Sequence, residues 1–199
     1  MTREVDRLTR SQREAIIRWK LGHHVFHLML ATMNTRLGEA TRALVAGEWT
    51  TTRSALVDLA RLYDAATSAM RYAADFPRRE YEVLVRPSMM PPFASVGFSG
   101  VHNTEHAAML AALRRLRGLY RERQAAVPEP VGAAWRQLLA AQRRNRNNHM
   151  FVCRRFVDGG TSLLQEYYAM QRKATEASGD PGGRPSARSC RDRVATTKE

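Results

Sequence analysis

The sequence predicts an all-α protein, a helical bundle without strands. Apolar residues recur at three- and four-residue spacing over several long stretches, prolines and glycines fall between these stretches, and no stretch alternates as a strand would. The chain has 199 residues, enough for one domain with a substantial core. We expect a single helical domain over residues 1–177, followed by a polar tail over 178–199.

The first predicted helix covers about residues 16–45 and ends at Gly47. The second is expected to begin at a cap formed by Thr51-Thr52 and to end before Phe76-Pro77. The first helix carries apolar residues on two faces, so we expect it to be buried on several sides. One face holds Ile17, Leu21, His24 and Leu28, and the other holds Trp19, His23, Phe26, Leu30, Met33 and Leu37.

Residues 86–100 form an apolar segment rich in proline and glycine. Its prolines, Pro87, Pro91 and Pro92, argue against a regular helix, and its glycines permit tight turns. We expect this segment to be a loop that folds over a core or a ligand. Three further helices are expected over residues 103–124, 131–157 and 162–173.

The terminal and cysteine patterns indicate a cytoplasmic protein. Residues 1–18 mix acidic and basic side chains, unlike a signal peptide, and no apolar run reaches the ~18 residues of a membrane span. Cys153 and Cys190 cannot build a disulfide framework, so both are expected to be free thiols. From Ser178 the composition is too polar to offset the entropy of chain ordering, and we expect a disordered, dispensable tail.

The net charge of +13 raises nucleic acid as a partner. The excess arginines cluster around residues 114–123 and 143–155, but no zinc-finger spacing, aromatic stripe or GxxG loop accompanies them. A solvated basic surface is therefore the preferred interpretation, and nucleic acid is an unlikely partner. The alternative from another functional class is a non-enzymatic basic helical module that binds nucleic acid or a partner protein.

The six histidines are unevenly distributed. The pairs His23/His27 and His102/His106 each share a helix face and could bind zinc, but no HExxH or Glu-x-x-His pattern supports a metal centre. His149 follows a polar run yet is expected on the inner stripe of its helix. There it could ligate a metal or haem iron, or it could be a core histidine bonded to a neighbour. The stripe comprises Trp135, Leu138, Gln142, Asn145, His149, Val152 and Phe156.

Several segments, taken in order, resemble the tryptophan 2,3-dioxygenase superfamily. The proximal segment is Asn147-Asn148-His149, then Arg155 six residues after the histidine, a Gly159-Gly160-Thr161-Ser162 loop and Tyr167-Tyr168. Upstream, Val96-Gly97-Phe98-Ser99-Gly100 resembles the family's SGFQS segment, and Trp19-x-x-x-His23 resembles its distal Phe-x-x-x-His. The chain departs from the pattern at Val96, in its shortened glycine loop, and in having no gap-free equivalent of the substrate-binding arginine.

The resemblance implies a helical bundle that encloses a haem b pocket. His149 would be the proximal iron ligand, and His23 or His24 would act on the distal side. The substrate carboxylate would be held by Arg86, or alternatively by Arg79. The other implied contacts are Gly97, Phe98 and Arg155 with the cofactor, Trp19 and Phe98 with the substrate ring, and Thr161 with the substrate ammonium or a haem propionate.

The reaction implied first is insertion of O2 into the indole of tryptophan to give N-formylkynurenine. The alternative is hydroxylation of a tyrosine- or tryptophan-like precursor in secondary metabolism, with O2 or peroxide as the oxidant. The partners expected are therefore an aromatic amino acid and O2 or peroxide, in a homo-oligomeric enzyme without a membrane partner. Whether the oxidant is O2 or peroxide stays open at this point.

Overall fold

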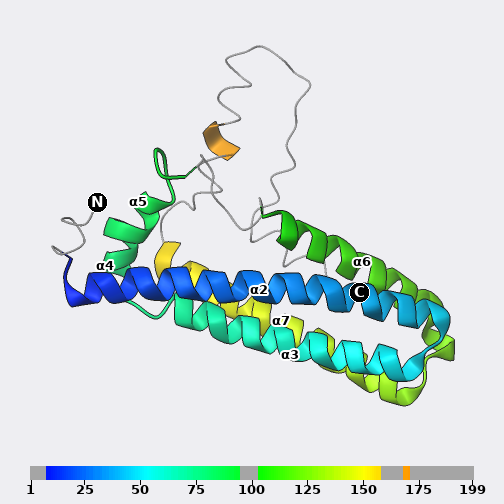
Figure 1. The fold of residues 1–199 in the computed structure, drawn as a ribbon. Coiled ribbons are helices and arrows are strands. Elements are labelled where there is room, and N and C mark those ends of the chain that lie inside the picture. Colours follow the sequence, from blue (N-terminus) through cyan, green and yellow to red (C-terminus); the bar gives the residue numbers. More distant parts are fainter. Residues whose placement is uncertain (1–7, 95–102, 158–167, 171–199) are drawn as a thin grey trace, which may run out of the picture.

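The computed structural model describes residues 8–94, 103–157 and 168–170. Across these residues all regular structure is helical and no strand occurs, which confirms the predicted all-α class. Four long helices run side by side in an elongated bundle, with short helical turns at one end (Figure 1). In the described part of the chain, no helix is long and apolar enough to cross a membrane.

Helix α2 (Arg10–Ala46) begins six residues before the predicted start. The reason is a capping box: the Thr9 hydroxyl accepts from the Gln12 backbone N–H at 3.2 Å, and the Gln12 side chain accepts from the Thr9 N–H at 2.9 Å. The helix ends as predicted at Gly47, whose φ of 74° lies in the left-handed region that glycine adopts without strain.

Helix α3 (Trp49–Ala73) begins before the predicted Thr51-Thr52 cap. Thr52 is instead inside the helix, fully buried, and its hydroxyl donates to the Glu48 carbonyl at 2.9 Å. Because Thr52 lies inside the helix and its hydroxyl bonds a carbonyl of the preceding turn, it does not act as the N-terminal cap. The helix ends shortly before Phe76-Pro77, as predicted.

The chain stays helical further than the proline pattern predicted. It forms α4 (Arg78–Glu80), a π-helical turn η1 (Tyr81–Val85) and α5 (Arg86–Ser88). Pro87 lies at the start of α5, directly after the π-helical turn. The predicted loop therefore begins only after Ser88.

The remaining described helices agree with prediction to within a few residues. Helix α6 (Thr104–Arg123) begins at Asn103, whose side chain caps the His106 N–H at 3.0 Å. It continues into the 3₁₀ turn η3 (Gln124–Ala126), and α7 covers Glu129–Val157. Of the predicted fifth helix over 162–173, only residues 168–170 are described, and they are helical. The predicted tail over 178–199 lies outside the described residues.

Helix α3 lies between α2 and α7, and α2 also packs against α6 (Figure 1). The ring of Tyr120 on α6 stacks on Trp135 of α7, with centroids 4.2 Å apart. The core between these helices is built from aliphatic side chains whose spacing follows the helical period. Its largest fully buried members are Leu30, Met33, Leu37, Leu44, Leu56, Leu59, Leu116, Val131 and Leu138.

The prediction that α2 is buried on several sides is wrong for its first half. The face holding Trp19, Leu30 and Leu37 points toward the bundle, but the opposite face has no neighbour among the described residues. Periodicity shows that a face is apolar, and only the packing of neighbouring helices shows whether it is covered. The exposed side chains are Ile17, Leu21, Val25 and Leu28.

A second, smaller core holds one end of the bundle together. Phe156 of α7 stacks on Tyr81 at 4.6 Å and on Phe76 at 5.2 Å between ring centroids. Trp19 of α2 meets the edges of the Phe76 and Tyr81 rings at 6.4 and 6.1 Å. This aromatic cluster fixes the first turns of α2 against the last turns of α7.

Candidate functional site

Histidines from three helices gather near this end of the bundle. In α2 they are His23, His24 and His27, and the His27 Nδ1 accepts from the Asn103 side-chain amide at 3.1 Å, at the start of α6. His106 of α6 in turn lies close enough to His149 of α7 for its positive charge to lower the pKa of His149. The tertiary structure therefore brings together groups that lie far apart in the sequence, 76 residues in the case of His27 and Asn103.

His149 does not point into the apolar interior as the stripe predicted. It is exposed, and the neighbouring Asn148 is the buried residue of this turn, at 6% exposure. One residue along a helix rotates the side chain by about 100°, so a stripe can be misread by one position. Asn148 takes the inward position because Arg71 of α3 supplies a hydrogen-bond partner there.

The imidazole of His149 nevertheless has properties of a ligand. Partial burial by the surrounding protein, and then the charge of His106, lower its pKa, so the ring is neutral at pH 7. Its Nδ1 lies 3.6 Å from the Sγ of Cys153, one turn further along α7. A neutral imidazole keeps a nitrogen lone pair available for a metal ion or a proton.

His23 has a defined tautomer. Its Nδ1 lies 2.7 Å from the Trp19 carbonyl oxygen, which can only accept, so Nδ1 carries the proton. Burial lowers the pKa of His23 more than this hydrogen bond raises it, and the ring is neutral at pH 7 with Nε2 unprotonated. The Trp19 ring lies 4.1 Å from the His23 ring between centroids and holds its orientation. By residue surface area, both His23 and the alternative His24 are exposed.

The other predicted site residues are distributed differently. Arg86 is half-buried on α5, and the alternative Arg79 is exposed on α4. Arg155 donates to the Phe76 carbonyl at 3.1 Å and lies over the Phe156 ring. Gly97, Phe98 and Thr161 lie outside the described residues.

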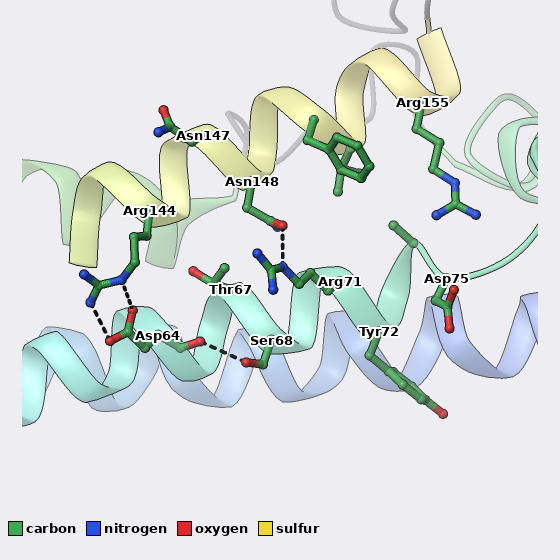
Figure 2. Close-up of a pocket in the computed structure, with 13 residues that line it drawn as sticks. Asp64, Thr67, Ser68, Arg71, Tyr72, Asp75, Arg144, Asn147, Asn148 and Arg155 are labelled. Atoms are coloured by element: carbon green, nitrogen blue, oxygen red, sulfur yellow. Dashed lines mark hydrogen bonds and ion pairs between the residues drawn. The ribbon is translucent and has the colours of Figure 1, made fainter. Parts of the chain in front are cut away.

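A further cavity is lined mostly by residues to which the sequence assigned no role; Arg155 is the exception. It is an open groove of about 870 Å³ between α3 and α7 (Figure 2). Arg71 and Asn148 meet in the middle of this groove, where the Arg71 Nε donates to Asn148 Oδ1 at 2.9 Å. Arg71 was not singled out from the sequence, and Asn148 was named only as part of the segment that precedes His149; a stripe shifted by one position there would have placed Asn148 inward. Among the described residues, no group of three or more His, Cys, Asp or Glu could hold a metal ion.

Comparison with known proteins identifies a family. The SfmD 3-methyl-L-tyrosine peroxygenase family matches residues 2–150. The chain belongs to this family. A relative from Streptomyces lavendulae, a 3-methyl-L-tyrosine peroxygenase, is 31% identical over 157 residues, which cover 76% of this chain. The chain spans about two-fifths of the length of that relative (40%). No solved structure matches the chain.

Membership of this peroxygenase family bears on the two reactions expected from the sequence. The relative's name specifies a tyrosine-like amino acid and peroxygenase chemistry, which favours the hydroxylation alternative over tryptophan dioxygenation. The matched region ends at residue 150, just after His149. Most of the proximal segment that resembles the tryptophan 2,3-dioxygenase superfamily therefore lies beyond the matched residues, and kinship with that superfamily stays a prediction.

Proposed function

We propose that this protein is a haem-dependent oxygenase that hydroxylates the ring of a tyrosine-like amino acid. Peroxide is the oxidant that the family favours: the ring C–H becomes C–OH, and the second peroxide oxygen leaves as water. The observation that carries the proposal is membership of the peroxygenase family, in a chain where burial and the charge of His106 lower the pKa of His149. Hydroxylation of a tyrosine-like compound replaces tryptophan dioxygenation as the first choice.

The described residues suit haem by their donor chemistry. His149 would hold the iron, because its lowered pKa leaves a nitrogen lone pair free at neutral pH. The cofactor, when bound, would supply the activation of peroxide or O2 that side chains alone lack. Arg155, on the same helix, would contribute positive charge toward the cofactor's propionates.

His23 would handle the proton. Its Nδ1–H is committed to the Trp19 carbonyl, so Nε2 is the only position where the neutral ring can accept a proton. A phenol or a peroxide brought to Nε2 could transfer its proton there. Trp19 would act by orienting the imidazole, since its own ring packs into the aromatic cluster with Phe76 and Tyr81.

The substrate carboxylate is assigned to Arg86, with Arg79 as the alternative. Arg86 is half-buried, which strengthens a charge-assisted hydrogen bond relative to the exposed Arg79. Gly97, Phe98 and Thr161 keep their proposed roles beside the cofactor and the substrate on the basis of sequence resemblance alone.

The decisive experiment is reconstitution with haem. The wild-type protein should develop a Soret band near about 400 nm, and with peroxide it should add one oxygen atom to 3-methyl-L-tyrosine or L-tyrosine, detected by mass spectrometry. His149→Ala should lose the band or change the ferrous spectrum. His27→Ala removes an imidazole from the same end of the bundle and should keep the spectrum.

Three outcomes would contradict this proposal. Unchanged haem content and spectrum in His149→Ala would refute the ligand assignment. Oxidation of L-tryptophan in preference to both tyrosines would restore the dioxygenase interpretation, and absence of any haem-type spectrum would refute the proposed cofactor.

A further inference from the structure

The groove between α3 and α7 is crossed by three polar contacts, one per helical turn. Asp64 accepts two hydrogen bonds from Arg144, at 2.9 and 2.7 Å, and Thr67 bonds Asn145 at 3.0 Å. The third is the bond from Arg71 to Asn148. Figure 2 shows the first and third of these contacts side by side along the groove. Only the first pairs a cation with an anion.

The Asn148 side chain fixes the orientation of Arg71. A guanidinium has donors only, so the oxygen of the amide must face Arg71 and the Nδ2 donor must point elsewhere. That Nδ2 is buried and has no hydrogen-bond acceptor, although the residue lines the groove. Arg71 uses Nε for the amide, which leaves the Nη1 and Nη2 donors of its exposed side chain without a partner among the described residues.

Positive charge in the groove exceeds the carboxylates available to neutralise it. Asp64 is engaged by Arg144, and Asp75 pairs at 3.1 Å with Arg18. Arg71 and Arg155, which also line the groove, form no ion pair with a described residue, since each donates to a neutral oxygen. Figure 2 shows both guanidinium groups extending from their helices into the space between α3 and α7.

We propose that this groove is a carboxylate-binding site, in which Arg71 contacts the ligand and Asn148 is its positioning residue. A carboxylate accepts two parallel hydrogen bonds from the planar guanidinium edge, which the Nη donors of Arg71 can supply. The groove volume of about 870 Å³ admits a ligand the size of an aromatic amino acid or one edge of a larger cofactor. Many arginines of this chain are exposed, but Arg71 is set apart because the nine-tenths-buried amide of Asn148 holds it in this groove.

The inference rests on the proposed function for the source of the carboxylate. One source is the amino-acid substrate, whose carboxylate the sequence resemblance assigns to Arg86. The other is a propionate of the haem. Both present the same group, so the geometry of Arg71 does not depend on the choice, and the experiment separates the two sources.

The test compares ligands with and without the carboxylate. Isothermal titration of the cofactor-free protein at low salt uses L-tyrosine against tyramine, and absorbance titration uses haemin against its dimethyl ester. Each is measured on the wild type, Arg71→Gln and Arg53→Gln. Arg53 is an exposed arginine of the same helix that does not line the groove, so its variant controls for the change in net charge.

We expect Arg71→Gln to weaken one of the two carboxylate ligands roughly tenfold, equivalent to about 1.4 kcal/mol. Its carboxylate-free analogue should be unaffected, and Arg53→Gln should resemble the wild type. The effect should shrink as salt is raised, because the site is open to solvent. Whichever pair of ligands shows the effect identifies the source of the carboxylate.

Asn148 variants test its positioning role separately from folding. Asn148→Asp places an anion beside Arg71, so it should keep the fold by circular dichroism while abolishing the preference for L-tyrosine over tyramine, or for haemin over its ester. Asn148→Leu should also reduce that preference. A purely structural role would alter stability and leave the preference unchanged.

The outcomes separate this site from the proposed function. If haem binds through His149 and Arg71→Gln changes neither titration, or if no carboxylate ligand binds the wild type more tightly than its analogue, the carboxylate site is refuted. If Arg71 governs carboxylate binding but no haem-type spectrum forms, the site stands and the haem proposal falls.

Discussion

The close approach of α2 and α3 at Gly22 gives the most sharply defined prediction. A Cβ at this position would lie 2.4 Å from the Ala73 Cβ, 2.8 Å from the Ala73 Cα and 3.0 Å from the Ala69 carbonyl oxygen. Non-bonded carbon atoms prefer about 3.5–4.0 Å. None of these three atoms is the end of a flexible side chain, so the helices themselves would have to separate.

Two opposing effects decide the sign for Gly22→Ala. Alanine is favoured over glycine in a helix by about 0.8–1.0 kcal/mol. Overpacking a well-packed site costs typically about 1–3 kcal/mol, and rigid neighbours place this site in the upper half of that range. We therefore expect a net loss of about 1–2 kcal/mol in the free energy of unfolding, or roughly 2–8 °C in Tm at ~2–4 °C per kcal/mol.

Gly118 of α6 is the matched control. It is a helix-interior glycine, and a Cβ built there meets nothing within 4 Å. Gly118→Ala should therefore be stabilised by up to about 1 kcal/mol. Urea unfolding followed by far-ultraviolet circular dichroism would measure both variants. If Gly22→Ala were as stable as the wild type, the close approach of α2 and α3 would be wrong.

The remaining predictions concern pH, the core and the substrate. Folding lowers the pKa of both His23 and His149, so the unfolded chain binds protons more readily. The contribution of these residues to the free energy of unfolding should therefore be constant above the ordinary histidine pKa of 6.5 and should fall as the pH drops below it. Replacing both residues with Gln should flatten that slope in urea titrations at pH 5 to 8, and an unchanged slope would argue against partial burial of the two rings. Leu138→Ala, at a fully buried position, should cost about 2–5 kcal/mol in the same assay, and a cost under ~1 kcal/mol would place Leu138 outside the core. Arg86→Lys should keep the fold and weaken amino-acid binding at least about tenfold, whereas Arg79→Lys should do much less. If Arg79→Lys weakened binding more than Arg86→Lys, the substrate carboxylate would be assigned to Arg79. If neither variant changed binding, the Arg71 groove would be favoured as the carboxylate site.

Local features of this fold could be predicted because they depend on neighbouring residues. The end of α2 at Gly47 follows from glycine's access to positive φ, the start of α6 follows from the Asn103 cap, and Pro128 and Pro130 mark the junction of α6 and α7. The start of α2 at Arg10 could also have been predicted from the sequence, because Thr9 and Gln12 form a recognisable capping box. The helical turns up to Ser88 were not, since packing of Tyr81 and Met89 into the aromatic core stabilises them.

The site was predictable in its residue types and less so in its geometry. The sequence by itself determined which groups carry the chemistry: histidines confined to three segments, and an aromatic residue one turn before His23. Only the tertiary structure decided that the charge of His106 acts on His149, that Asn148 and not His149 points inward, and that Arg71 is held in a groove. The physical reason is that helical periodicity fixes the relative directions of side chains on one helix. Which direction becomes the interior depends on where the neighbouring helices lie, and that is set by contacts between residues far apart in the chain.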